Sequence, residues 1–240
     1  MNYFRIIYKT IIDALFPLSK EEHDLLSLSP EETLMHLPPA PPYDASVVIM
    51  PNTSSILAYQ DKRVSRLVWN IKYKKDAHSL AIAASVMYKK LKLFEESAGK
   101  TSRMSADKLI LIPMPSAPRR RRERGYNQCE LLVNAIKVLD AENLMVVETD
   151  LLFRTQYTSH QKMKGRMERL ESSKNLFEVK ENATNISNVA SVTANKRIAY
   201  LNELIIVIDD VITTGSTMKE ALECLQTAGF KNVGGLSLAH

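Results

Sequence analysis

The sequence predicts an α/β protein whose mainly parallel sheet lies between helices. Strand, helix and strand patterns alternate from residue 203 to 240, as in the βαβ unit of a parallel sheet. The run ELIIVIDDV is continuously apolar up to its acids, which is typical of a strand buried on both faces. With 240 residues, 45% of them hydrophobic and 25% charged, the chain fits one domain, or one domain with a small cap, around an ordinary core.

The first residues predict an amphipathic helix docked on the body of the protein. Four apolar side chains recur there at helical spacing: Ile7, Ile11, Ala14 and Leu15. Charged residues interrupt the apolar run, so we expect neither a signal peptide nor a membrane span, and binding at a membrane surface is the weaker alternative. The run LPPAPPYD at 37–44 has four prolines in five positions and ends this arm.

Two helices are predicted next, at about 64–75 and 77–91, because apolar residues recur at helical spacing in both segments. We therefore divide the chain into a helical N-terminal arm with its proline-rich linker at 1–43, a helical hood or cap at 44–107, and an α/β core at 108–240.

The core is predicted from short apolar runs that alternate with helical patterns. Helices are expected at about 131–139 and 218–228, and the polar segment 181–197 is expected to be a surface excursion. The expected strands are LILIP, LMVVE, NLFEV, ELIIVIDDV and VGGLSLA.

The stretch VIDDVITTGST, Val207–Thr217, predicts a ligand site at the end of its strand. Ligands of open α/β sheets bind beyond the carboxyl ends of the strands, where Asp209 and Asp210 stand. The small residues that follow offer backbone N–H groups, hydroxyls and a helix N-terminus to a phosphate. Ionised carboxylates only accept hydrogen bonds, so the acids suit the vicinal hydroxyls of a ribose. A ribose 5-phosphate would be held at both ends.

A simpler interpretation is a capped turn that binds nothing. Thr217–Glu220 matches a capping box, which predicts Thr217 as the N-cap of the next helix. Capping explains neither the acid pair nor the run of hydroxylated residues, so ligand binding is the preferred hypothesis.

The same stretch resembles the phosphoribosyl pyrophosphate (PRPP) signature of the type I phosphoribosyltransferases: an apolar strand, two acids and then T-T-G-x-T. The resemblance implies that family's fold, and Mg²⁺ that is bound through PRPP rather than directly by the protein. It implies that Asp209 and Asp210 bind the ribose. It places the 5-phosphate at Val211, Ile212, Thr213, Thr214, Gly215, Ser216 and Thr217.

A second resemblance narrows the family. RRRRERGYNQCELL, after the strand LILIP, is similar to the R-x-R-G-F/Y-N-Q segment of the ComF (competence protein F) group, and LVWNIKYKKD resembles its earlier helix with a Lys-aromatic step, here Lys72-Tyr73. Further matching positions are Arg154, Gln161, Arg169, Asn175 and Phe177. The four-cysteine zinc module usual in that group has no counterpart in this sequence, so we expect no zinc.

In the sister enzymes the loop after the first core strand holds the pyrophosphate. The resemblance implies this role for Pro113, Met114, Pro115 and Ser116, with Arg119, Arg120 and Arg124 near enough to neutralise the leaving group. Two other interpretations of the arginine-rich loop are open, a solvated basic loop and a surface for single-stranded DNA. No catalytic side chain is predicted, because the five histidines are scattered.

Charge and cysteine content bound the partners and the compartment. The formal charge of +5 suits an anionic ligand, either a phosphorylated small molecule or a nucleic acid. Cys129 and Cys224 are far apart and form no C-x-x-C, which indicates core thiols in a reducing cytoplasm.

These observations predict a PRPP-binding protein that transfers a phosphoribosyl group to an unidentified nitrogen acceptor and releases pyrophosphate. A non-catalytic PRPP sensor or a factor in competence and DNA uptake is the alternative, with single-stranded DNA as a further candidate partner. A homodimer is left open as the assembly.

Overall fold

The computed structural model describes residues 29, 32, 36–43, 46–47, 51–100, 108–155, 176–179 and 199–240, with backbone alone at 95–100. The predicted N-terminal amphipathic helix and the predicted surface excursion at 181–197 lie outside these ranges. In chain order the elements are β1 (Thr53–Leu57), α4 (Lys62–Trp69), the π-helix η1 (Asn70–Lys74), α5 (Ala77–Lys100), β2 (Leu109–Pro113), α6 (Pro118–Arg124), α7 (Gln128–Leu139), β3 (Met145–Val147), β4 (Leu152–Arg154), β5 (Phe177–Val179), β6 (Leu204–Val211), α10 (Ser216–Thr227) and β7 (Asn232–Ala239).

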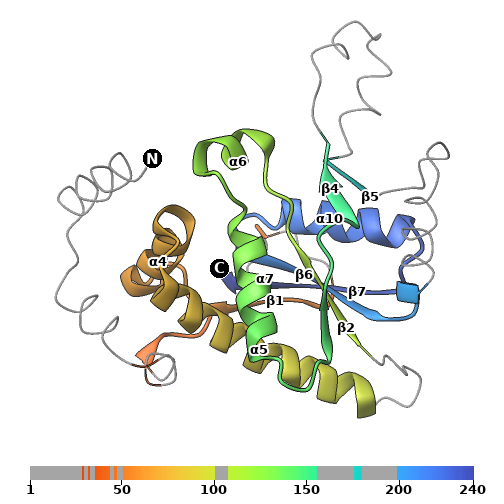
Figure 1. The fold of residues 1–240 in the computed structure, drawn as a ribbon, viewed down its shortest axis with the longest axis horizontal. Coiled ribbons are helices and arrows are strands. Elements are labelled where there is room, and N and C mark those ends of the chain that lie inside the picture. The colour runs from red at the N-terminus through yellow and green to blue at the C-terminus, as the bar shows by residue number, and fades with distance from the viewer. Residues whose placement is uncertain are drawn as a thin grey trace, which may run out of the picture.

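Five strands form one parallel sheet in the order β1-β7-β6-β2-β3 (Figure 1). This confirms the predicted fold class. Strand β6, which carries the acid pair, lies in the centre between β7 and β2. The predicted strand NLFEV does form, as β5, but it pairs antiparallel with β4 in a separate small sheet. Strand β4 was not predicted from the sequence.

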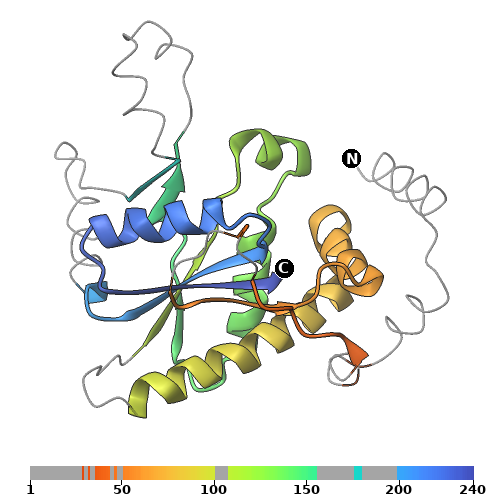
Figure 2. The same cartoon turned by 180° about the vertical axis from the view of Figure 1, so that it is seen from behind.

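The two faces of the sheet bury different sets of side chains, because successive residues of a strand point to opposite faces. Ile206 and Ile208 of β6 belong to one hydrophobic cluster, with α4, α5 and α7. Ile205 and Val207 belong to the other, with α10, β4 and β5. In Figures 1 and 2, α10 lies on one side of the sheet and α5 and α7 lie on the other.

Strand β1 was not predicted, and it lies within the range expected to be a helical hood. It pairs in parallel with β7 and so belongs to the same sheet as the predicted core. On its free edge the proline-rich segment runs alongside it, with an antiparallel bridge from Pro39 to Leu57 and a 2.8 Å bond from the Ala40 N–H to the Ile56 carbonyl. An edge suits proline, which lacks an N–H for a further strand. The boundary proposed at residue 107 thus divides elements that share one sheet.

Within the described part of the chain, no helix combines the length and the apolar character that a membrane crossing needs.

Gly234 in β7 marks the closest approach between the sheet and the segment before β1. A Cβ at this position would lie 2.7 Å from the backbone oxygen of Asn52 and 3.1 Å from Cδ1 of Ile206. The same Asn52 oxygen accepts a 3.0 Å hydrogen bond from the Gly235 N–H, so it cannot withdraw without losing that bond.

Gly234→Ala should therefore lower the free energy of unfolding by about 1–3 kcal/mol, measured by urea denaturation. Val138→Ala, at a side chain 84% exposed on α7, is the control and should stay within about 0.5 kcal/mol of the wild type. Equal urea midpoints for the two variants would contradict the close approach.

Candidate functional site

A pocket of about 380 Å³ opens at the carboxyl ends of β2 and β6. The parallel register places these ends side by side, since Pro113 pairs with Ile208. The lining residues come from the β6–α10 turn, the loop after β2, the starts of α6 and α7, and three more distant segments: Tyr59, Lys72, Met114, Pro115, Ser116, Ala117, Arg120, Gln128, Cys129, Arg154, Asp209, Asp210, Val211, Ile212, Thr213, Thr214, Gly215, Thr217 and Met218.

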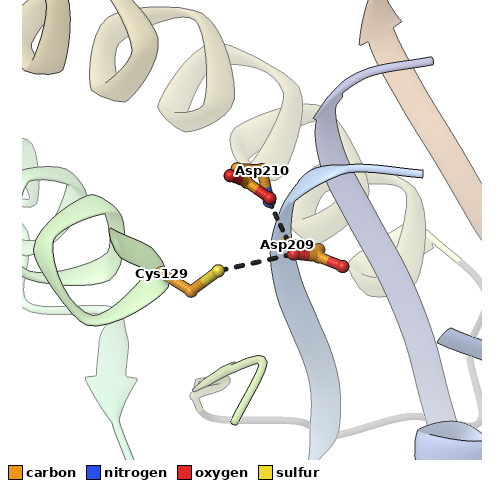
Figure 3. Close-up of side chains that lie close together, drawn as sticks. All are labelled: Cys129, Asp209 and Asp210. Atoms are coloured by element: carbon orange, nitrogen blue, oxygen red, sulfur yellow. Dashed lines mark hydrogen bonds between the residues drawn. The ribbon is translucent and has the colours of Figure 1, made fainter. Parts of the chain in front are cut away.

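The acid pair is held by hydrogen bonds at the end of β6. Asp209 Oδ1 accepts the Asp210 N–H at 2.8 Å and the Cys129 thiol at 3.4 Å (Figure 3). Asp210 Oδ1 accepts the Val211 N–H at 2.9 Å, and its Oδ2 forms a 2.9 Å ion pair with Lys72 Nζ. Each carboxylate therefore has a fixed direction before any ligand binds.

The two acids differ in their electrostatic surroundings. Burial, and then repulsion from the Asp210 carboxylate, raise the pKa of Asp209 from its ordinary 3.8 to about 7. Burial and the charge of Asp209 likewise raise the pKa of the Cys129 thiol well above its ordinary value, so the thiol stays protonated and donates to Asp209. Lys72 offsets the charge of Asp210. Near neutral pH the pair therefore carries less than its full negative charge.

The turn after β6 contains Thr213, Thr214 and Gly215, and α10 begins at Ser216. Gly215 is the N-cap residue with φ of 77°, a left-handed backbone that glycine adopts readily, and no side chain caps the helix. The prediction that Thr217 caps α10 is wrong, because the N-cap is Gly215, two residues earlier, and Thr217 lies inside the first turn of the helix. Thr217 lines the pocket.

The loop after β2 is fixed from both sides. The Met114 N–H donates to the Ile208 carbonyl at 2.8 Å, and the Asn127 side-chain amide donates to the Met114 carbonyl at 3.0 Å. Met114, Pro115 and Ser116 line the pocket, whereas Pro113 is a buried residue of β2. The binding of pyrophosphate by this loop stays a prediction. The hydroxyl of Ser116 is buried and has no hydrogen-bond partner within the described residues, so it is free to bond a ligand.

The arginine-rich segment is a short helix, α6, and the prediction of a loop is wrong. Pro118 starts this helix and Gly125, with φ of 78°, ends it. Of the three predicted arginines only Arg120 lines the pocket. Arg119 is exposed and forms an ion pair with Glu123, and Arg124 bonds Gln128 at 3.0 Å.

The residues Gly125 to Gln128 connect the parts of the site. The Tyr126 hydroxyl lies 2.7 Å from the Lys72 carbonyl and 3.0 Å from the Ile71 carbonyl, which ties this segment to η1. The Asn127 Oδ1 accepts the Cys129 N–H and so caps α7, while its amide holds the loop after β2. Gln128 lines the pocket, and its side-chain oxygen accepts a hydrogen bond from the Arg124 guanidinium.

Seven lining residues were not among the predicted site residues. Neither Lys72 nor Gln128 was assigned to a subsite from the sequence, although both lie in segments that resemble the ComF group. The Lys72-Tyr73 and Asn127-Gln128 steps of the resemblance were the available signals for them. Arg154 also lay in a matching position, and its guanidinium lies 5.5 Å from the ring centre of Phe177, another matched residue. The other four, Tyr59, Ala117, Cys129 and Met218, carried no signal for a site in the sequence.

Cys129, Asp209 and Asp210 bring one ligand atom each to within 4.8 Å of one another, a spacing that a metal ion can occupy. A protonated thiol and a carboxylate already paired with Lys72 are poor ligands for a hard cation. These three side chains are better suited to lie near a cation that a ligand in the pocket holds than to bind the cation themselves. The expectation that no protein side chain binds the metal directly stays a prediction.

Comparisons with known proteins agree with this geometry. The model of the phosphoribosyl transferase domain matches residues 157–239, which include β6 and its turn. Competence protein F of Haemophilus influenzae is 29% identical over 130 residues, which is 54% of this chain. The chain spans about half, 49%, of the length of that relative. These similarities confirm that the sequence resembles the type I phosphoribosyltransferases and, among them, the ComF group.

A solved hypoxanthine phosphoribosyltransferase from Staphylococcus aureus is similar over 72% of this chain and 62% of its own, with 12% identity and a TM-score of 0.28. A likeness this weak supports no detail of the site.

The raised pKa of Asp209 makes stability depend on pH. The native state keeps a proton that the unfolded state has released, so this residue lowers the free energy of unfolding as pH rises from about 4 to about 7. The side chain of Asp209→Asn has no group that titrates in this range. The free energy of unfolding of this variant should gain on the wild type by about 2–3 kcal/mol between about pH 5 and about pH 8. Urea denaturation across this range measures the difference.

Asp61→Asn is the control for this measurement. A side-chain bond from Arg63 holds the pKa of Asp61 below its ordinary value, so its stabilisation is lost only at lower pH. The slope of this variant above pH 5 should match the wild type, and the same slope in Asp209→Asn would contradict the raised pKa.

Proposed function

This chain is a ComF-like member of the type I phosphoribosyltransferase family, and we propose that it binds PRPP in the pocket described above and transfers the phosphoribosyl group to a nitrogen acceptor. The observation that carries the proposal is the convergence of three groups in one pocket: the acid pair, the turn before α10, and the loop after β2 with Arg120. PRPP has three matching parts, a ribose, a 5-phosphate and a pyrophosphate.

In this proposal each part of PRPP meets the chemistry that suits it. Asp209 and Asp210 accept hydrogen bonds from the ribose hydroxyls. The turn and first residues of α10, 211–217, surround the 5-phosphate with N–H groups and hydroxyls. The Ser116 hydroxyl and the Arg120 guanidinium meet the pyrophosphate.

The reaction proposed is a substitution at the anomeric carbon. The nitrogen lone pair forms the new C–N bond, the C–O bond to pyrophosphate breaks, and pyrophosphate leaves with the electron pair while the nitrogen loses a proton. The protein contributes mainly by holding the reactants and by stabilising charge on the leaving group. Mg²⁺ would accompany PRPP, held by its oxygens, and would neutralise part of that charge when bound. An ion held by PRPP needs no direct protein ligand, which suits a pocket whose acids already contact the Cys129 thiol and the Lys72 ammonium.

Single-stranded DNA is a second candidate ligand, for a surface outside the pocket. Helix α6 carries Arg119, Arg121 and Arg122 on exposed positions that do not line the pocket. Binding of this kind would weaken steeply with salt and would not respond to PRPP.

The first test concerns the acid pair. PRPP with Mg²⁺ at about a hundredfold excess over Kd should stabilise the fold by about 2.7 kcal/mol, a rise in Tm of several degrees. Asp209→Asn with Asp210→Asn should largely remove this rise, because amides present donors to the ribose hydroxyls. Asp150→Asn, outside the pocket lining, should keep it. Thermal melts measure all three, and a full shift in the double variant would exclude ribose binding by the acids.

The second test compares two adjacent arginines. Arg120→Gln should weaken PRPP binding by about tenfold more than ribose 5-phosphate binding, because only PRPP carries the pyrophosphate. Arg119→Gln removes the same charge from a side chain that is 86% exposed and paired with Glu123, and should change neither affinity. Titration calorimetry with both ligands gives the ratio. Equal losses for the two ligands in Arg120→Gln would count against a pyrophosphate subsite at α6.

A further inference from the structure

Lys72 is a cation that enters the pocket from the segment before α5, far from the motifs of the core. Its Nζ lies 2.9 Å from Asp210 Oδ2. The Lys72 side chain is 21% exposed and the Asp210 side chain 7%, so the pair lies largely out of solvent. A buried carboxylate without a cation is costly, and the removal of one partner from such a pair leaves the other uncompensated.

The Asp210 carboxylate is held through both of its oxygens. Oδ1 accepts the Val211 N–H from its own strand, and Oδ2 meets Lys72 from η1. The strand bond alone leaves the plane of the carboxylate free to turn, and the Lys72 ammonium at Oδ2, an ion pair without hydrogen-bond geometry, restricts that rotation by charge attraction. Each oxygen still has a lone pair for a hydroxyl donor.

The backbone around Lys72 is unusual and is held by a second element. Residues Asn70–Lys74 form a single π-helical turn, in which the Lys75 N–H donates to the Asn70 carbonyl five residues back. Lys75 itself has a left-handed backbone with φ of 52°, which costs free energy for a residue with a Cβ. Single π-helical turns often occur at functional sites.

Tyr126 stabilises this turn. Its hydroxyl shares one proton between the carbonyls of Lys72, at 2.7 Å, and Ile71, at 3.0 Å. The Lys75 ammonium lies 4.1 Å from the centre of the Tyr126 ring. The segment that caps α7 and holds the loop after β2 thus also sets the direction of Lys72.

We propose that Lys72 is a positioning residue for the ribose subsite, which acts by fixing the Asp210 carboxylate as an acceptor for ribose hydroxyls, and that Tyr126 sets its position through η1. The inference rests on the proposed function, since it requires that the acid pair accepts ribose. It assigns Lys72 no direct contact with phosphate.

The experiment measures Kd by titration calorimetry for two probes, ribose 5-phosphate and inorganic phosphate. Lys72→Met should weaken ribose 5-phosphate by about tenfold, equivalent to about 1.4 kcal/mol, and leave phosphate within about twofold. Lys72→Arg keeps the cation and should retain most of the affinity. Lys74→Met is the matched control, because it removes the same charge from the same turn, where Lys74 lies 5.1 Å from the Trp69 ring centre and outside the pocket lining.

A double-mutant cycle separates action through Asp210 from any other effect. Lys72→Met combined with Asp210→Asn should bind ribose 5-phosphate as weakly as Asp210→Asn alone. Tyr126→Phe keeps every charge and leaves both partners of the buried ion pair in place, and it should give a smaller loss that is again confined to ribose 5-phosphate.

Three results would overturn the inference. Equal losses for both probes in Lys72→Met would mean that Lys72 attracts phosphate directly. Unchanged affinity for ribose 5-phosphate in both Lys72→Met and Tyr126→Phe would mean that the ion pair only ties η1 to β6. Additive losses in the cycle would mean that Lys72 does not act through Asp210. Failure of the wild type to bind ribose 5-phosphate would instead reject the proposed function. This outcome distinguishes a failure of the proposed function from a failure of the inference about Lys72.

Discussion

The parallel register of β2 and β6 is the constraint on which the rest of the site depends. Pro113 pairs with Ile208, and the Met114 N–H extends the pairing one bond beyond β2. Two loops that are nearly a hundred residues apart in sequence therefore leave the sheet at the same edge. The loop after β2 is bounded by prolines and contributes the Ser116 hydroxyl, which has no hydrogen-bond partner in the parts of the chain that the structure describes. The loop after β6 contributes the acid pair. Neither loop forms a pocket without the other.

The segment from Gly125 to Gln128 converts this edge into a fixed arrangement. Asn127 caps α7 with its oxygen and holds the loop after β2 with its amide, so one side chain aligns a helix with a loop. Tyr126 reaches in another direction, to the carbonyls of η1. Tyr126 and Asn127, in the segment that resembles the ComF group, therefore have structural roles that need no contact with a ligand.

Electrostatics in the pocket are balanced before a ligand arrives. Adjacent carboxylates repel each other, and burial adds to the free energy of their charged forms. The structure relieves this in two ways, by a raised pKa at Asp209 and by the ion pair of Asp210 with Lys72. A protonated Cys129 donates to Asp209 as well. The same groups that stabilise the acids in the free protein also orient them toward the pocket.

The sequence by itself determined the parallel α/β class, the central strand with its acids, and the turn before α10, because periodicity and small-residue runs are local properties of the chain. It did not show that Thr53–Leu57 joins the sheet, that α6 is helical, or that α10 begins at Ser216 without a side-chain cap. Those outcomes depend on neighbours distant in sequence. Strand β1 is stabilised by pairing with β7, and Lys72 contacts Asp210 from η1, whose carbonyls accept a hydrogen bond from Tyr126. Tertiary contacts can override local propensity, and the position of a cation relative to a buried acid is set only by tertiary packing.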